Sequence, residues 1–105
     1  MILCSTDTVP AREIIEHVGF VRASSVRSHH LGTDISSRVQ GLVGGEVPAY
    51  TKLLAEVREE SLDRMVREAQ ALGANAIVGI RYASVEISGD AAEILVYGTA
   101  VRIAE

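Results

Sequence analysis

The sequence predicts one α+β domain, a two-layer sandwich in which a mainly antiparallel sheet packs on one long helix plus a short helix. The 105 residues are enough for one domain and too few for two. Hydrophobic residues make up 48% of the chain and aromatic residues only 4%, so Val, Ile, Leu and Ala must build the core. Strand patterns stand on both sides of a helical pattern, which is typical of this class. We therefore treat residues 1–105 as a single domain.

The strand patterns differ in length and in how they are interrupted. Strands are expected over residues 1–5, 13–28, 76–87 and 92–103, with two strands nearly end to end as the alternative for 13–28. The 13–28 segment is rich in β-branched residues, and Gly19 interrupts it where a bulge or a close backbone contact is expected. Ser88-Gly89-Asp90 is a turn signal, so the last two strands should form an antiparallel hairpin.

The helical pattern lies in the middle of the chain. A long helix is expected from about Pro48 to Leu72, since its apolar residues recur at helical spacing and proline is tolerated in a first turn. Gly73 suits the left-handed position that ends many helices. A short helix is expected over 34–42, with Asp34 as its N-cap.

All three long strand patterns carry apolar residues on both faces. In the last strand, alternation places Leu95 and Tyr97 on one face and Ile94 and Val96 on the other. In the strand before it, Val78, Ile80 and Tyr82 face one way, and Ile77 and Ala83 face the other. In the long first strand, Val18 and Phe20 lie opposite Ile15 and Val21. One helix can cover only one face of the sheet. Burying one such side chain is worth about 1.5–3 kcal/mol, and an exposed apolar patch usually marks an interface.

The chain is therefore expected to be a homo-oligomer, with the second face or a sheet edge buried against identical subunits. The alternative is a monomer whose amino-terminal segment folds back over that face. Alternation does not say which strand face meets the helix. Our working assignment places Ile94 and Val96 against a neighbour and Leu95 in the subunit core.

Composition and charge exclude some partners. The net charge of −4 argues against binding of duplex nucleic acid, which normally needs a clustered basic face. No apolar run approaches about 18 residues, so no membrane partner is expected, and Met1-Ile2-Leu3-Cys4 lacks the basic region of a signal peptide. A single cysteine fits a reducing compartment. We expect a soluble cytoplasmic protein.

The candidate metal ligands are few: Cys4, His30, His29 and His17. A structural zinc site takes about four ligands, typically in closely spaced pairs. No Cys-x-x-Cys is present, and adjacent histidines in an extended segment point to opposite faces. One subunit is therefore not expected to bind metal, although a ring can gather Cys4 or one histidine from each copy. No cofactor is predicted.

Catalytic motifs are missing as well. Gly44-Gly45 precedes a helix but lacks the Gly-Lys-Ser/Thr of a phosphate-binding loop. Serines and histidines occur without a nucleophile-elbow pattern. The arginines, Arg22 and Arg81 among them, are expected mainly on solvated surface, with lining of a shared channel or pairing across interfaces as the alternatives. The sequence thus favours a protein that is not an enzyme.

Several motifs together resemble the YbjQ family, a family of uncharacterised bacterial and archaeal proteins described as "putative heavy-metal-binding". The stretches that carry the resemblance are Val43-Gly44-Gly45-Glu46, Leu72-Gly73-Ala74-Asn75-Ala76-Ile77-Val78-Gly79 and Tyr97-Gly98-Thr99-Ala100-Val101. The resemblance covers nearly the whole chain. It implies a dodecin-like β-α-β-β subunit in a ring-shaped homopentamer, and no established activity.

The expected function is that of a non-catalytic homopentameric scaffold or small-ligand-binding module. One alternative is a metal-binding or metal-sensing ring, with Cys4 and the histidines as ligands. The other is an enzyme whose site lies at a subunit interface.

Overall fold

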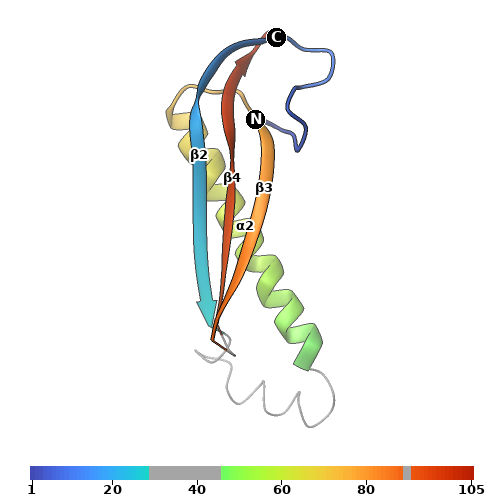
Figure 1. Ribbon diagram of the computed structural model, residues 1–105, viewed down its shortest axis with the longest axis vertical. Helices are drawn as coiled ribbons and strands as arrows, with labels where there is room; N and C mark the ends of the chain where they lie inside the picture. Colours follow the sequence, from blue (N-terminus) through green and yellow to red (C-terminus); the bar gives the residue numbers. More distant parts are fainter. Residues whose placement is uncertain (29–45, 89–90) are drawn as a thin grey trace.

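The computed structural model describes residues 1–28, 46–88 and 91–105, which form a four-stranded sheet with a long helix against one face (Figure 1). The elements are β1 (Ile2–Leu3), β2 (Ile14–Ser28), α2 (Glu46–Ala71), β3 (Ala76–Ser88) and β4 (Ala91–Ile103). The strand order is β1-β3-β4-β2, with β1 parallel to β3 and the other pairs antiparallel. The α+β class and the terminal hairpin are confirmed. The short helix predicted over 34–42 lies outside the described residues.

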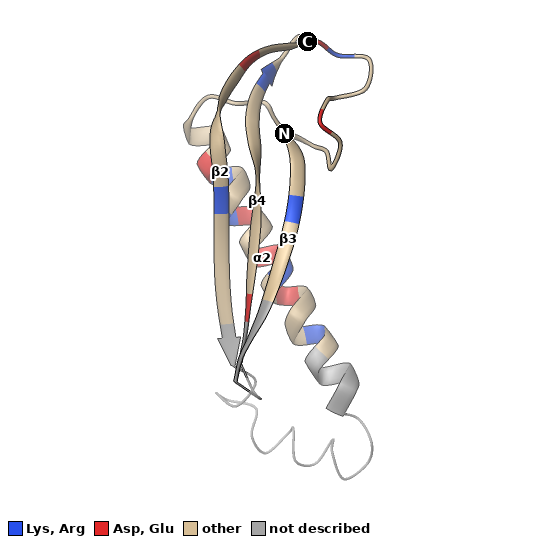
Figure 2. Cartoon of the chain, in the orientation of Figure 1, with Lys and Arg blue, Asp and Glu red and all other residues tan. Residues whose placement is uncertain are grey.

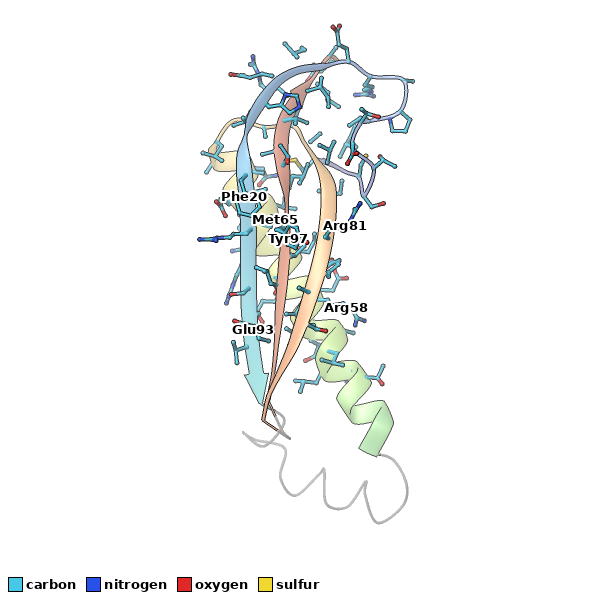
Figure 3. The ribbon with its side chains drawn as sticks, viewed as in Figure 1. Phe20, Arg58, Met65, Arg81, Glu93 and Tyr97 are labelled. Atoms are coloured by element: carbon cyan, nitrogen blue, oxygen red, sulfur yellow. The ribbon has the colours of Figure 1, made fainter. Side chains whose placement is uncertain are left out.

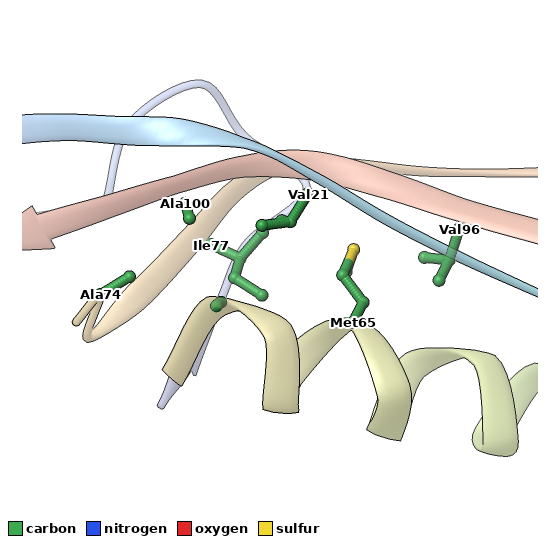
Figure 4. Close-up of a cluster of buried hydrophobic side chains, with 7 residues drawn as sticks. Val21, Met65, Ala74, Ile77, Val96 and Ala100 are labelled. Carbon is green, nitrogen blue, oxygen red and sulfur yellow. The ribbon is translucent and has the colours of Figure 1, made fainter. Parts of the chain in front are cut away.

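The main core lies between α2 and the sheet (Figure 4). Side chains four residues apart lie on one face of a helix. The helix accordingly buries one stripe of every fourth residue, which consists of Val57, Ser61, Met65 and Ala69. The sheet contributes Val21, Ile77, Val96 and Ala100. Ser61 is satisfied in this apolar layer, since its hydroxyl donates to the carbonyl of Ile94 at 3.3 Å.

The structure reverses our working assignment of the two faces of β4. Ile94 and Val96 are 3% and 0% exposed, and Val96 packs in the cluster that includes Met65 of the helix. Leu95 therefore lies on the face away from α2. Alternation groups residues by face correctly here, but apolar residues on both sides left the choice of covered face undetermined.

A bulge in β3 overturns the predicted faces of that strand. Val78 pairs with Thr99 but Arg81 pairs with Tyr97, and Gly79 has a positive φ of 63°. The extra residue returns Ile80 to the helix side, where it packs against the main core, while Val78 lies on the other side. The prediction that Val78 and Ile80 share a face is wrong, because strict alternation fails across a bulge.

A second irregularity, between His17 and Gly19, shifts the register of β2 against β4. Val18 and Val21 pack on the helix side, whereas Phe20 is 60% exposed on the opposite face. Of the two interpretations of Gly19, the bulge is the one observed, since a Cβ at Gly19 would meet no atom within 4 Å. Val18 and Phe20 do not share a face as predicted.

The amino-terminal segment covers one end of the face away from the helix. Val9 packs there with Ala76, Val78, Val101 and Ile103 in a second, smaller cluster. The segment is tied to β3 by backbone hydrogen bonds, Cys4 N to Ile77 O at 2.9 Å and Gly79 N to Thr6 O at 2.8 Å. A monomer would require the amino-terminal segment to fold back over the whole second face of the sheet. The segment covers only one end of that face.

The helix ends as predicted at a left-handed glycine. Gly73 has φ 87°, and the amides of Gly73 and Ala74 donate to the carbonyls of Gln70 and Ala69 at 3.0 and 3.1 Å. This pair of bonds is a Schellman motif. Across the described ranges, no helix is both long enough and apolar enough to cross a membrane.

Candidate functional site

The part of the sheet that neither α2 nor the amino-terminal segment covers is the candidate site, called here the open face. It faces the viewer in Figure 1, with the helix behind the sheet. Cross-strand partners in an antiparallel pair point to the same side, so the register gives its described members: Phe20, Arg22, Ser24 and Val26 of β2; Glu93, Leu95, Tyr97 and Thr99 of β4; and Arg81 and Ala83 of β3.

Aromatic rings form the centre of the open face (Figure 3). The ring centroids of Phe20 and Tyr97 are 6.3 Å apart at an interplanar angle of 48°, an ordinary attractive geometry for an aromatic pair. The guanidinium carbon of Arg22 lies 5.9 Å from the Phe20 centroid, within cation–π range. The rings and the arginine therefore form one contiguous patch.

This patch is apolar and accessible. Phe20 and Val26 are 60% and 53% exposed, and Leu95 and Tyr97 between them are half-buried. Large aromatic side chains are normally mostly buried in folded chains. A contiguous group of this kind is typical of a surface that binds another molecule.

Arginines flank the patch on both sides. Arg22 and Arg81 are both in register with Tyr97, one on each neighbouring strand, and Figure 2 shows these two positive positions on β2 and β3. Arg81 is oriented by its Nη1, which donates to the carbonyls of Ser5 and Ile80 at 2.7 and 2.8 Å. Among the described residues neither arginine forms an ion pair with a carboxylate.

The predicted metal ligands do not gather at one place in the described chain. Cys4 is half-buried against the Val9 cluster, and His17 is exposed on β2 opposite Val101. Within residues 1–28, 46–88 and 91–105, no three His, Cys, Asp or Glu side chains are grouped to hold a metal ion. His29 and His30 lie outside those ranges.

One tyrosine on the helix side has a perturbed acidity. Burial raises the pKa of Tyr82 above its ordinary value of 10.0, and the charge of Glu59 raises it further, whereas Arg58 opposes this shift. A raised tyrosine pKa keeps the hydroxyl protonated at neutral pH. The Tyr82 hydroxyl is therefore uncharged at neutral pH.

Sequence reasoning did not single out the open face as a site. It placed Phe20 with Val18 and treated Arg22 and Arg81 mainly as solvated surface. The available signal was the alternation Phe20, Arg22, Ser24, Val26 after the irregularity at Gly19. This alternation gives the correct face only if it is counted from Phe20, after the bulge, and not from Val18 before it.

The family model described as "Putative heavy-metal-binding" matches residues 1–104 of the chain. The chain belongs to the YbjQ family. UPF0145 proteins from Fervidobacterium nodosum and Hahella chejuensis are 50% and 44% identical to it. The first match covers 98% of this chain and 95% of the relative, and the second covers 96% and 97%.

A UPF0145 protein from Thermus thermophilus is 50% identical over 97% of this YbjQ-family chain and 90% of the relative. Among solved structures, the fold is similar to a protein of unknown function of the DUF74 family from Pediococcus pentosaceus. The TM-score is 0.65, with 17% identity, over 99% of this chain and 98% of that one. This likeness supports the α+β fold alone.

Proposed function

We propose that this YbjQ-family chain is the non-catalytic subunit of a cytoplasmic homo-oligomer, a pentamer as the resemblance implies, acting as a scaffold or a small-ligand-binding module. The observation that carries the proposal is the open face, where Phe20 and Val26 are more than half exposed beside Leu95 and Tyr97. Removing apolar area from water is worth roughly 25 cal/mol per Å². An identical copy is the partner that is always present.

Catalysis is not part of the proposal. The described open face offers aromatic rings and arginines, and also Ser24, Glu93 and Tyr97, whose residue types can act as nucleophiles or bases. Among the described residues no hydrogen bond joins these three side chains into a catalytic pair. Arginine and aromatic side chains are instead enriched at protein interfaces. The chemistry of the surface therefore supports association more than turnover.

Native mass spectrometry with light scattering tests the assembly. We expect one dominant species at five times the subunit mass, unchanged on tenfold dilution. A well-behaved monomer at both concentrations would contradict the proposal, and any other stable subunit number would retain the oligomer but overturn the pentamer. The same spectrum reports a bound small ligand as added mass.

A substitution in the patch tests whether the open face is the interface. Phe20→Asp should dissociate the oligomer while the far-UV circular dichroism stays unchanged, since the side chain is 60% exposed and lies outside the core. Leu72→Asp is the matched control, because Leu72 is also an exposed hydrophobe, at 50%, but follows the end of α2. Equal dissociation by both variants would locate the interface elsewhere.

Metal binding by the assembled ring is the second candidate. It is favoured by the family description and by the half-buried thiol of Cys4 at the end of β1. Several copies would have to contribute one Cys4 each, since soft metals prefer thiolate ligands. Protein purified without a metal-affinity tag should then contain stoichiometric zinc or copper, and Cys4→Ala should remove it. Metal-free wild-type protein whose melting temperature does not respond to zinc would exclude this function.

A further inference from the structure

The segment that connects β1 to β2, residues 4–13, is called here the strap. Because β1 and β2 lie at opposite edges of the sheet, the strap crosses one end of the sheet, and Figure 1 shows it in dark blue beyond β3. Its ends are tied by the bonds Ile2 N to Asn75 O and Ala104 N to Glu13 O. Within the strap, Val9 is the one buried side chain. A single apolar anchor and a few backbone hydrogen bonds therefore hold it.

The strap supplies the hydrogen-bond acceptors for the bulge of β3. The amide of Gly79 donates to the carbonyl of Thr6 at 2.8 Å, and the amide of Ile80 donates to the carbonyl of Cys4 at 3.1 Å. A bulge leaves its extra residue unpaired by the neighbouring strand. The strap therefore satisfies backbone groups that β4 does not.

The same part of the strap orients Arg81 on the open face. The Nη1 of Arg81 donates to the carbonyl of Ser5 at 2.7 Å, and Ser5 lies between the two residues that accept from the bulge. Displacement of the strap would remove all three acceptors together. The position of this guanidinium group is thus linked to the state of the strap.

A strained turn follows the anchor of the strap. Ala11 has φ 62°, in the left-handed region that glycine adopts easily and alanine does not. Pro10 precedes it, and the amide of Arg12 donates to the carbonyl of Val9 at 3.2 Å. This is the pattern of a type II turn, whose third residue is normally glycine. The closed strap therefore includes a backbone conformation that opposes closure.

We propose that the strap opens and closes independently of the helix–sheet core, and that its closed state orients Arg81 on the open face. Segments with few buried apolar contacts open at lower free energy than core strands do. Opening would uncover the side chains that pack with Val9, including Val78, which is in register with Thr99 of the open face. The strap would thus change both the apolar area and the charge geometry of that face.

Hydrogen exchange resolved by residue tests the opening. The amides of Gly79 and Ile80 should exchange at least about tenfold faster than that of Val96 in the central strand β4. Val9→Ser should speed exchange at Gly79 and Ile80 by about tenfold more, because it weakens the apolar anchor. Ala11→Gly should slow it about threefold, because it relieves the strained turn. One common rate for all three amides, or no response to either substitution, would overturn the proposal.

Val66→Ser is the matched control, because Val66 is half-buried on the helix side of the sheet. It should leave the exchange of Gly79 and Ile80 unchanged. Cys4 gives an independent readout, since it is the single cysteine of the chain and its half-buried thiol lies in the strap. Its alkylation rate should rise in Val9→Ser and fall in Ala11→Gly. The opposite order would contradict the opening.

The NMR signals of the Arg81 guanidinium protons test its orientation. Closed strap should give separate signals, because the bonds to Ser5 and Ile80 hinder rotation, and Val9→Ser should merge them. Signals that do not change in Val9→Ser would overturn the link between strap and arginine.

Only the effect on association rests on the proposed function. Val9→Ser should raise the dissociation constant of the oligomer about threefold, but should change it no further in a chain that already carries Arg81→Ala. Equal effects in both chains would contradict a route through Arg81. A monomeric wild type would overturn the proposed function alone, since the exchange and NMR measurements decide the strap in a monomer as well.

Discussion

At the scale of single residues, Gly98 is the position where the bulge of β3 leaves no room for a side chain. A Cβ there would lie 2.8 Å from Ile77 Cγ2, 3.0 Å from the carbonyl of Val78 and 3.2 Å from Ile80 Cγ1. Backbone at that distance cannot move aside without disturbing the β3–β4 ladder. The glycine is thus a packing requirement of the bulge.

Gly98→Ala should lower the free energy of unfolding by about 1–3 kcal/mol, the usual cost of overpacking a core. Urea denaturation at fixed protein concentration measures it, since association adds to the stability of an oligomer. Gly19→Ala is the control, because a Cβ at Gly19 meets no atom within 4 Å. Equal losses in both variants would contradict the packing argument.

Asn75 acts as an extra backbone unit where the strands end. Its Nδ2 donates to the carbonyl of Ile103 at 3.1 Å, and its Oδ1 accepts from the Ile103 amide at 2.8 Å. Its own amide and carbonyl bond to Val101 and Ile2. One residue thus joins β4, β3 and β1.

Asn75→Ala should cost about 1–3 kcal/mol, because it leaves half-buried groups of Ile103 unpaired. Hydrogen exchange should show faster exchange of the Ile103 amide. Gln70→Ala, a truncation of an exposed amide on the helix, should cost well under about 0.5 kcal/mol. A stable Asn75→Ala variant with a still-protected Ile103 amide would show that other groups close this end of the sheet.

At the scale of elements, α2 is fixed to the sheet at its polar edge as well as through its core. Arg64 donates from Nη1 to the carbonyl of Ser24 on β2 at 3.0 Å and from Nη2 to Glu60 at 2.7 Å. At the carboxyl end of α2, the Schellman motif at Gly73 turns the chain from the helix into β3. The edge of the helix–sheet contact at Arg64 and its carboxyl end are therefore specified by particular residues.

Gly73→Ala should lower the stability by about 1 kcal/mol, because φ of 87° places a Cβ in a strained conformation. Gly73→Asn should lose less, since asparagine tolerates the left-handed region. Thermal unfolding of the two variants and wild type checks the order. Alanine and asparagine variants with equal melting temperatures would mean that the helix ends by another route.

At the scale of the whole molecule, the sheet has one face covered by its own helix and one mostly bare. This asymmetry makes neighbouring residues of β4 serve different purposes. Val96 faces Met65 of the helix, whereas Leu95 pairs with Ser24 and Ala83 on the open face.

Leu95→Asp should give a folded subunit that no longer associates, and Val96→Asp should give an unfolded or insoluble chain, because a buried unpaired charge costs several kcal/mol. Circular dichroism and light scattering separate the two outcomes. The opposite pattern, with Val96→Asp folded and dissociated, would mean that the helix lies on the other face of the sheet. Soluble, fully assembled protein from both variants would contradict the interface.

The sequence alone determined the strands, the long helix, its glycine stop and the terminal hairpin. These features follow from local patterns: β-branched runs, helical spacing of apolar residues, and Gly73 or Ser88-Gly89-Asp90 as turn signals. The sequence also placed Leu95 with Tyr97 on one face and Ile94 with Val96 on the other, because side chains alternate between the two faces of a strand. The same alternation revealed the apolar surplus on both faces of the sheet.

Only the tertiary structure decided which face α2 covers and how the bulges at Gly79 and Gly19 reset the alternation after them. Those choices depend on contacts between segments far apart in the chain, such as Gly98 against Ile77 and Thr6 against Gly79. A local pattern has no information about them, because either face of an evenly apolar strand can be buried at similar free energy. The open face with Phe20 and Tyr97 therefore became visible as a site only when β2, β4 and β3 lay side by side.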